Sequence, residues 1–166
     1  MEDDVLKNIG TIARALDAIA NVEFKQFDLT KGQYVYLVRI CEHPGIVQSH
    51  LAELVKIDRS TAARAIKKLE ANGLVERRKQ PGNDKNKALF ATDKGMAVYP
   101  TLKRENDYSN EVALTGISEA DRQKLLELTN QMAQNVGLIG RWLRMGISEL
   151  TKVYVVRCIA QFGTPP

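Results

Sequence analysis

Residues 46–73 read "IVQSHLAELVKIDRSTAARAIKKLEANG", which holds two helical patterns of apolar residues with very few residues between them. The second pattern follows Asp58, a residue type that caps helix N-termini, and ends at Gly73, a residue type that ends helices. The first pattern starts near Gln48. Its predicted buried residues are Leu51, Leu54 and Val55. Two short helices joined so tightly predict a helix-turn-helix.

The second of these helices has two chemically different faces when its residues are placed 100° apart. Its apolar face consists of Ala62, Ala65, Ile66 and Leu69. Its opposite face consists of Ser60, Arg64 and Lys67, with Thr61 and Lys68 beside it. Arginine can bind guanine O6 and N7 with two hydrogen bonds, hydroxyls can contact bases or phosphates, and lysines suit phosphates. A charged helix face is by itself more often only solvated than a binding surface. The neighbouring segments are therefore needed to distinguish the two interpretations.

Positive charge is concentrated around this helix. Residues 56–87 carry ten Lys or Arg against four Asp or Glu, a net +6, whereas the whole 166-residue chain carries +4 with a pI of about 9.1. The remainder of the chain is therefore slightly acidic. A local excess of this kind is the footprint expected for phosphate binding.

A basic β-hairpin is predicted directly after the helix. The segments "LVERRKQ" (74–80) and "KALFAT" (87–92) resemble strands, and "PGND" (81–84) favours a turn. Lys85 and Lys87 follow the turn, where the hairpin tip would meet phosphates or an A·T-rich minor groove. The combination of helix-turn-helix and basic hairpin favours DNA binding over a solvated face.

Amphipathic helices are predicted on the N-terminal side of this region. Apolar residues at helical spacing from Val5 to Ala20 follow the acidic "EDD" (2–4), which suits a helix N-terminus. A second helix is expected to open with a capping box formed by Thr30 and Gln33 and to stop at "HPG" (43–45).

Two further helices are predicted on the C-terminal side. Thr92 opens one of them, and Pro100 should bend or split it near Tyr99, because proline removes a backbone hydrogen bond. Ser118 and Asp121 have the spacing of a capping box and open the last helix, whose apolar residues are Leu125, Leu128, Met132 and Val136. The pattern ends there. Residues 137–166 fit an added helix, a partly ordered tail or appended sequence, and these alternatives stay open.

Several other classes of protein are disfavoured by the composition. The hydrophobic content of 44% suffices for the core of one domain, and no apolar run approaches the roughly 20 residues of a membrane span. The N-terminus does not resemble a signal peptide, so a cytoplasmic protein is expected. His43 and His50 lack nearby ligands for a metal, and Cys41 fits a buried core position. No phosphate-binding loop or set of catalytic residues is present, so we expect no enzyme and no cofactor.

The segment from Leu29 to Gly95 resembles the MarR-type winged helix-turn-helix transcription regulators. The resemblance rests on "LT..Q", "PG", "LA", "RST", "LE..GLVERR", a turn with aspartate and "T.KG", in this order and spacing. It implies a mainly α fold with a small β-hairpin wing and a homodimer on a pseudo-palindromic DNA operator. With the flanking helices it would extend over residues 5–136.

The resemblance also implies a division of the chain and a set of DNA-binding residues. The winged lobe would be 31–95, the helical dimerisation region 1–30 with 96–136, and the tail 137–166. The implied DNA-binding residues are Gln48, Arg59, Ser60, Thr61, Arg64, Lys67, Lys68, Arg78, Lys79, Lys85, Asn86 and Lys87. Two departures stand out: Asn86 replaces the arginine usual in the family's wing, and Val47 replaces the usual Ser or Thr cap.

The sequence therefore predicts a DNA-binding transcription regulator, expected to be a ligand-responsive repressor. The alternative is a winged helix that mediates protein association or binds nucleic acid without sequence preference. Tyrosines at positions 34, 36, 99 and 108 would suit a cleft for a phenolic or similar effector, although core packing explains each of them equally well.

Overall fold

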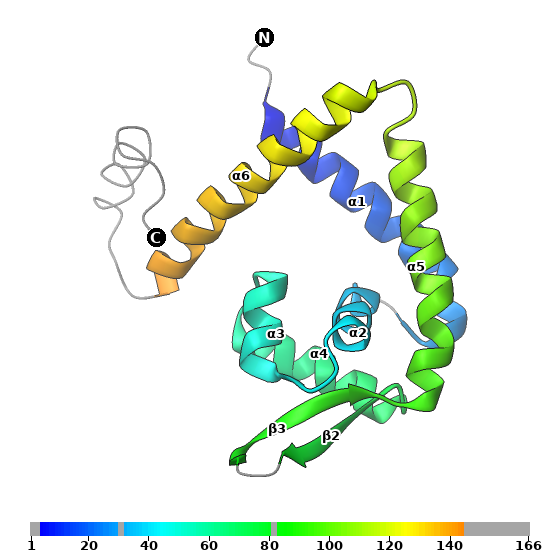
Figure 1. Ribbon diagram of the computed structural model, residues 1–166, viewed down its shortest axis with the longest axis vertical. Coiled ribbons are helices and arrows are strands. Elements are labelled where there is room, and N and C mark those ends of the chain that lie inside the picture. The colour runs from blue at the N-terminus through cyan, green and yellow to red at the C-terminus, as the bar shows by residue number, and fades with distance from the viewer. Residues whose placement is uncertain (1–3, 30–31, 81–82, 145–166) are drawn as a thin grey trace. The chain divides into compact units, whose positions relative to one another are not determined.

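The computed structural model describes residues 4–29, 32–80 and 83–144 of the chain (Figure 1). It divides into two units, residues 1–113 and 114–166. The first contains α1 (Val5–Glu23), the 3₁₀-helix η1 (Lys25–Phe27), α2 (Gln33–Glu42), β1 (Ile46–Val47), α3 (Gln48–Val55), α4 (Arg59–Ala71), β2 (Val75–Gln80), β3 (Asn83–Ala91) and α5 (Asp93–Ala113). The second contains α6 (Glu119–Arg144).

The helix starts follow capping chemistry at two of the expected places. At α1, the Asp4 carboxylate accepts a hydrogen bond of 3.1 Å from the N–H of Lys7. At α6, the Ser118 hydroxyl accepts one of 3.2 Å from the N–H of Asp121 and donates one of 2.6 Å to its carboxylate. Both caps satisfy N–H groups that a helix start leaves without a partner.

Helix α2 starts after a glycine cap. Gly32 is the capping residue, with a φ of +70°, and Gln33 is the first residue of the helix. The predicted capping box of Thr30 and Gln33 stays a prediction, because Thr30 lies outside the described residues. A glycine at the cap is favourable here because it adopts a positive φ without steric cost.

The start of α5 explains why the "T.KG" motif suits this fold. The Thr92 hydroxyl accepts a hydrogen bond of 3.1 Å from the Gly95 N–H and donates one of 2.7 Å to the Gly73 carbonyl. A Cβ at Gly95 would lie 2.2 Å from the carbonyl oxygen of Leu74, so no side chain fits there. The motif thereby joins the end of α4 to the start of α5.

Helix α5 runs through Pro100 without being split, so that alternative is wrong, and the predicted bend stays a prediction. Helix α6 also exceeds its predicted end, because it continues through Gly137 and Gly140 to Arg144. Glycine costs only about 1 kcal/mol inside a helix and does not stop one by itself. Within the described part of the chain, no helix combines the length and apolarity needed to cross a membrane.

The sheet has three antiparallel strands in the order β1-β3-β2. Leu89 of β3 is paired with Ile46 on one side and with Arg77 on the other. The sequence predicted the β2–β3 hairpin, but β3 begins at Asn83, inside the segment predicted as a turn, and not at Lys87. The sequence missed β1, which is only two residues long and is defined by pairing with a segment some forty residues later.

One hydrophobic core joins the helices of the first unit to the sheet. Its fully buried large side chains are Leu29, Leu37, Ile40, Leu51, Ile66, Leu69, Leu74, Leu89 and Leu102. The predicted burial of Leu54 is wrong, since its side chain is 41% exposed while Ala52 is buried. The buried face of α3 is centred between Leu51, Ala52 and Val55, which leaves Leu54 at its margin. The core fixes α3 and α4 against the sheet and so positions the candidate interface.

Candidate nucleic-acid interface

A tight turn connects α3 to α4. Lys56 ends α3 in the left-handed conformation with a φ of +60°. The following N–H, of Ile57, donates a hydrogen bond of 3.0 Å to the carbonyl of Ala52. Asp58 then has extended backbone angles and caps α4. Only two residues therefore lie between the turn residue and the start of α4, as a helix-turn-helix requires.

The two faces of α4 agree with the prediction from helical periodicity. Ala62, Ile66 and Leu69 are fully buried, while Ala65 packs against the core in a partly buried position. The opposite side is open to solvent and presents Arg59, Ser60, Arg64, Lys67 and Lys68. Burial of each large apolar side chain stabilises the helix by about 1.5–3 kcal/mol relative to exposure. The packing of the apolar side therefore keeps the basic side of α4 facing solvent.

The N-terminal turn of α4 is organised by one carboxylate. Asp58 Oδ1 accepts hydrogen bonds from the Ser60 hydroxyl at 2.5 Å and the Thr61 N–H at 2.8 Å. Its Oδ2 accepts one from the Thr61 hydroxyl at 2.6 Å. The Ser60 hydroxyl, the Thr61 hydroxyl and the Thr61 N–H hold the pKa of the Asp58 carboxyl well below its usual range. The cap was predicted from sequence, whereas the role of the two hydroxyls was not.

Arg64 and Gln48 contact groups at the same end of α4. The Nη2 atom of Arg64 donates a hydrogen bond of 3.2 Å to the Thr61 hydroxyl oxygen. Gln48, the first residue of α3, is half-buried, and its Nε2 lies 3.5 Å from the carbonyl oxygen of Arg59. Val47 provides no side-chain cap for α3, as the sequence suggested. Gln48, Arg59, Ser60, Thr61 and Arg64 of the predicted site therefore lie around the first two turns of α4, whereas Lys67 and Lys68 lie further along the helix.

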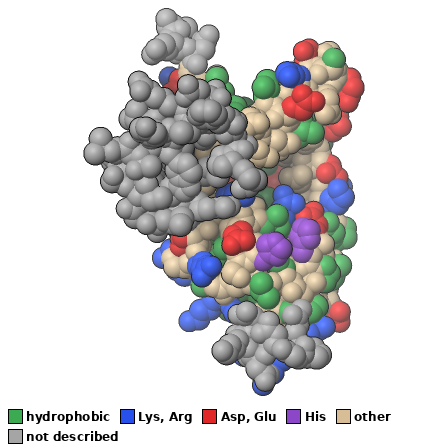
Figure 2. Space-filling view, turned by 60° about the vertical axis from the view of Figure 1, so that its left-hand side comes forward, with side chains coloured by type: hydrophobic (Ala, Val, Ile, Leu, Met, Phe, Trp, Pro, Cys, Tyr) green, Lys and Arg blue, Asp and Glu red, His purple; other side chains and the backbone are tan. Residues whose placement is uncertain are grey.

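The wing brings a second group of basic residues to the first unit. Lys79 and Lys87 are paired across β2 and β3, and both side chains are exposed. Like charges directly opposite each other in a sheet repel, so this pair gains from a bound anion. Lys85 and Asn86 were also predicted to contact DNA, but their side chains lie outside the described residues. Figure 2 shows several Lys and Arg side chains around the wing.

The two arginines of the wing are already engaged within the protomer. Arg77 Nε donates a hydrogen bond of 2.9 Å to Glu70 Oε1 of α4, which ties the wing to that helix. Arg78 forms an ion pair with Glu76, and its guanidinium carbon lies 4.8 Å from the ring centroid of Phe90. Arg78 remains well exposed, and its position on the strand is compatible with a contact in which a DNA phosphate replaces Glu76 as its partner.

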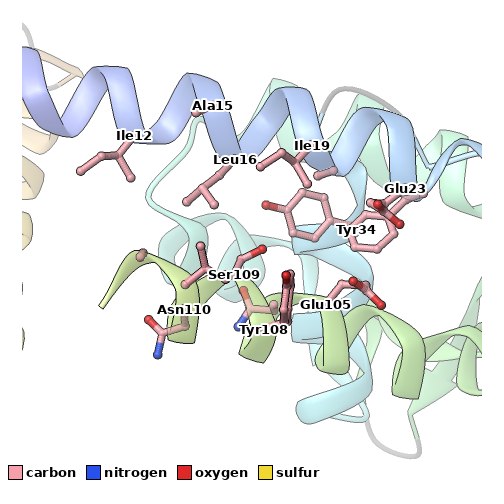
Figure 3. A pocket seen from close by; sticks show the side chains of 15 residues that line it. Ile12, Ala15, Leu16, Ile19, Glu23, Tyr34, Glu105, Tyr108, Ser109 and Asn110 are labelled. Carbon is pink, nitrogen blue, oxygen red and sulfur yellow. The ribbon is translucent and has the colours of Figure 1, made fainter. Parts of the chain in front are cut away.

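A cavity of about 530 Å³ lies between α1, α2 and α5 in the first unit (Figure 3). Apolar side chains of α1, among them Ile12, Leu16 and Ile19, face Tyr34 and Tyr108 across it. Of the four tyrosines that the sequence singled out, these two line the cavity, whereas Tyr36 is buried in the core and Tyr99 packs against it. Tyr34 both lines the cavity and packs against the core, so the cavity borders the core at this point.

The polar lining of this cavity is uncharged or acidic. Glu23 and Glu105 line it from its two facing helices, together with Asn106, Ser109 and Asn110. Its described lining residues include no Lys, Arg or His. Burial, and secondarily the charge of Asp17, raise the pKa of the Tyr34 hydroxyl, which keeps this group neutral as a hydrogen-bond donor. On α5 the sequence singled out Tyr108 but not Glu105, Ser109 and Val112, although all four have the spacing of one helix face.

The two histidines and Cys41 have ordinary structural positions. His43 and His50 are exposed (Figure 2), and in the described ranges no three His, Cys, Asp or Glu residues are grouped to hold a metal ion. Cys41 is buried, and burial together with the charge of Glu42 raises the pKa of its thiol to about 11. A thiol of this kind is unreactive at neutral pH, which confirms its interpretation as a core residue.

Comparisons with known proteins agree with this geometry. Residues 29–87 match the sequence model of the MarR family. The chain is 49% identical over 144 residues to an uncharacterized HTH-type transcriptional regulator, YybA, of Bacillus subtilis, covering 87% of this chain and 96% of that protein. A crystal structure of a putative MarR family transcriptional regulator from Listeria monocytogenes, complexed with 26mer DNA, is 48% identical with a TM-score of 0.85, covering 89% and 98% of the two chains.

A more distant structure adds a bound ligand. The PcaV transcriptional regulator from Streptomyces coelicolor, in complex with its natural ligand, is 25% identical with a TM-score of 0.63, covering 81% of this chain and 97% of that one. The solved structures thus include both a DNA complex and a ligand complex of similar proteins.

Proposed function

The chain belongs to the MarR family of transcriptional regulators, which are DNA-binding proteins and not enzymes, and we propose that it acts as a homodimeric repressor on a pseudo-palindromic operator. The observation that carries the proposal is the open side of α4. It presents guanidinium, ammonium and hydroxyl groups on a helix whose other side is fixed by the core. An α-helix of this kind fits the major groove of B-DNA.

Homodimerisation is supported by apolar side chains that the protomer leaves exposed. Helix α1 exposes Val5, Leu6, Ile9, Ile12, Ile19 and Val22. In the second unit, α6 exposes Leu125, Leu126, Leu128 and Val136. A second copy would cover such surfaces, and two recognition helices would then address half-sites about one DNA turn apart. In this proposal residues 31–95 form the DNA-binding lobe, and residues 1–30 with 96–136 form the dimerisation region.

An effector is the second part of the proposal, and the cavity between α1, α2 and α5 supports it. Its apolar walls and two tyrosines suit a small aromatic molecule such as a phenol. Because its charged lining residues are both carboxylates, the ligand would be neutral or cationic rather than an organic anion. Such a ligand releases DNA only if it binds more tightly to the conformation that cannot bind the operator.

The decisive experiment is a fluorescence-anisotropy titration of the full-length protein with DNA from upstream of its own coding sequence. The control is a shuffled duplex of the same length and composition. A specific regulator binds the upstream DNA at least about a thousandfold more tightly. Equal affinity for the two duplexes would sink the proposal of a sequence-specific regulator and leave a non-specific binder. Sedimentation of the same sample, with and without DNA, tests the dimer.

A further inference from the structure

The hydroxyl protons at the start of α4 are already used within the protein. A hydroxyl has one proton to donate, and those of Ser60 and Thr61 are both directed at the Asp58 carboxylate, at 2.5 and 2.6 Å. Hydrogen bonds to a carboxylate are among the stronger ones in proteins, so breaking them to donate to a phosphate would bring little gain. What these two side chains can still offer is the lone pairs of their oxygens.

One of those lone pairs is also used. The Thr61 oxygen accepts a hydrogen bond of 3.2 Å from Arg64 Nη2, which forms a chain from guanidinium to hydroxyl to carboxylate. The three residues are spaced three apart and therefore lie on neighbouring turns of one helix side. Thr is branched at Cβ and restricted at χ1, so it is a stiff link. Consecutive hydrogen bonds also polarise one another, which strengthens the chain.

We propose that Thr61 is a positioning residue for DNA recognition. Its hydroxyl, held by the Asp58 carboxylate, orients the Arg64 guanidinium before DNA binds. The proposal rests on the proposed function, because it concerns how α4 discriminates between bases. Arg64 is the group that reads guanine, and Thr61 acts through it. Ser60 and Thr61 meet DNA only as acceptors, which suits the amino groups of adenine and cytosine and excludes phosphates.

The expected gain is one of preorganisation. An arginine that is free in solution has many rotamers, and immobilising such a side chain weakens binding. Removing the link should therefore lower discrimination at the base pair read by Arg64 by roughly three- to tenfold, without affecting other positions. If the link only stabilised the helix, its removal would lower the affinity for every duplex by the same factor.

The variants can separate these two roles. Thr61→Val keeps the shape of the side chain and removes the hydroxyl, while Thr61→Ser keeps the hydroxyl. Both leave the Thr61 N–H and the Ser60 hydroxyl bonded to Asp58, so the cap persists. Ser60→Ala is the matched control, since it removes one hydroxyl from the same carboxylate without touching the link to Arg64. Thermal unfolding by circular dichroism verifies that each variant folds.

The probe is a duplex selected by the wild-type protein from a randomised pool, with a panel of its single base-pair substitutions measured by anisotropy. The Arg64→Ala variant identifies the base pair that Arg64 reads. At that pair, Thr61→Val should lose discrimination, Thr61→Ser and Ser60→Ala should keep it, and Thr61→Val should cause no further loss in the Arg64→Ala background.

Two results would overturn the positioning role while leaving the proposed function intact: a uniform loss of affinity in Thr61→Val, or an additive loss in the double variant. A wild-type protein that selects no sequence from the pool would instead overturn the proposed function, and the positioning role with it.

Discussion

Helices α4 and α1 each present one chemically distinct side to solvent, and these two sides are chemically opposite. The open side of α4 carries charges and hydroxyls, and several of these bond to one another within the helix. The open side of α1 carries aliphatic side chains, with Leu6 59% and Val22 76% exposed. A charged side is stable in water and binds an oppositely charged partner on demand, whereas an apolar side gains free energy only when something covers it. The first is suited to DNA and the second to a permanent protein partner.

The largest expected effect comes from charging the apolar side. Leu6→Glu places a carboxylate where a second copy would pack, which should give a monomer and weaken operator binding by at least about a hundredfold, because the two lobes then bind independently. Sedimentation equilibrium and anisotropy measure both effects. Ala18→Glu adds the same charge about 120° around α1 from Leu6, outside the row formed by Leu6, Ile9 and Ile12, and should change both quantities far less. A dimeric Leu6→Glu protein with normal DNA affinity would exclude this side as the interface.

The next effect distinguishes two residues on the open side of α4. Arg64→Ala should cost about 1–3 kcal/mol at one base pair and relax specificity there. Lys67→Ala should weaken binding to all duplexes equally and reduce the slope of log affinity against log salt by about one. Anisotropy titrations at several salt concentrations measure both quantities. If both variants lost affinity uniformly, α4 would be an electrostatic surface and not a reader of sequence.

These helix sides were predictable from the sequence because they depend on local spacing. The cap at Asp58 and the partition of α4 follow from positions three and four residues apart. Strand β1 was missed because its two residues carry no periodicity and pair with β3 far along the chain. The contact of the Arg78 guanidinium with the Phe90 ring depends on the register between β2 and β3, which composition does not specify. The sequence pattern therefore could not predict contacts that depend on pairing between distant segments of the chain.

The proposed ligand class of the cavity beside α1 can be tested through the charge of the ligand. Phenol should bind more tightly than benzoate, by roughly three- to tenfold, because Glu23 and Glu105 disfavour an anion. Glu23→Gln should narrow this gap, while Glu53→Gln, on an exposed position of α3, should leave it unchanged. Isothermal titration calorimetry without DNA measures the affinities. A preference for benzoate in the wild-type protein would contradict the assigned ligand class.

A smaller effect is expected at the wing tip, where Asn86 replaces the family's usual arginine. Guanidinium fits a narrow minor groove better than ammonium or amide groups do. Asn86→Arg should therefore raise the affinity for duplexes with A·T-rich flanks severalfold more than for duplexes with G·C-rich flanks. Anisotropy with the two duplexes provides the comparison. Unchanged affinity for both would mean that the tip does not reach the minor groove.

The smallest effect concerns the acid stability of the open side of α4. Because hydrogen bonds from Ser60 and Thr61 depress the pKa of Asp58, its contribution is complete above the ordinary carboxyl pKa of about 4 and is lost only as the pH falls through the lower pKa of the folded protein. The difference in free energy of unfolding between wild type and Asp58→Asn should be constant from about pH 5 to 7 and shrink below about pH 4. Urea titrations across this range measure it. The aliphatic side chains exposed on α1 do not titrate, so Leu6→Ala, compared with wild type in the same way, should show no such dependence on pH. If the Asp58→Asn difference instead declined already between pH 7 and 5, the carboxylate would not be held by the hydroxyls, and the starting point of the link to Arg64 would be lost.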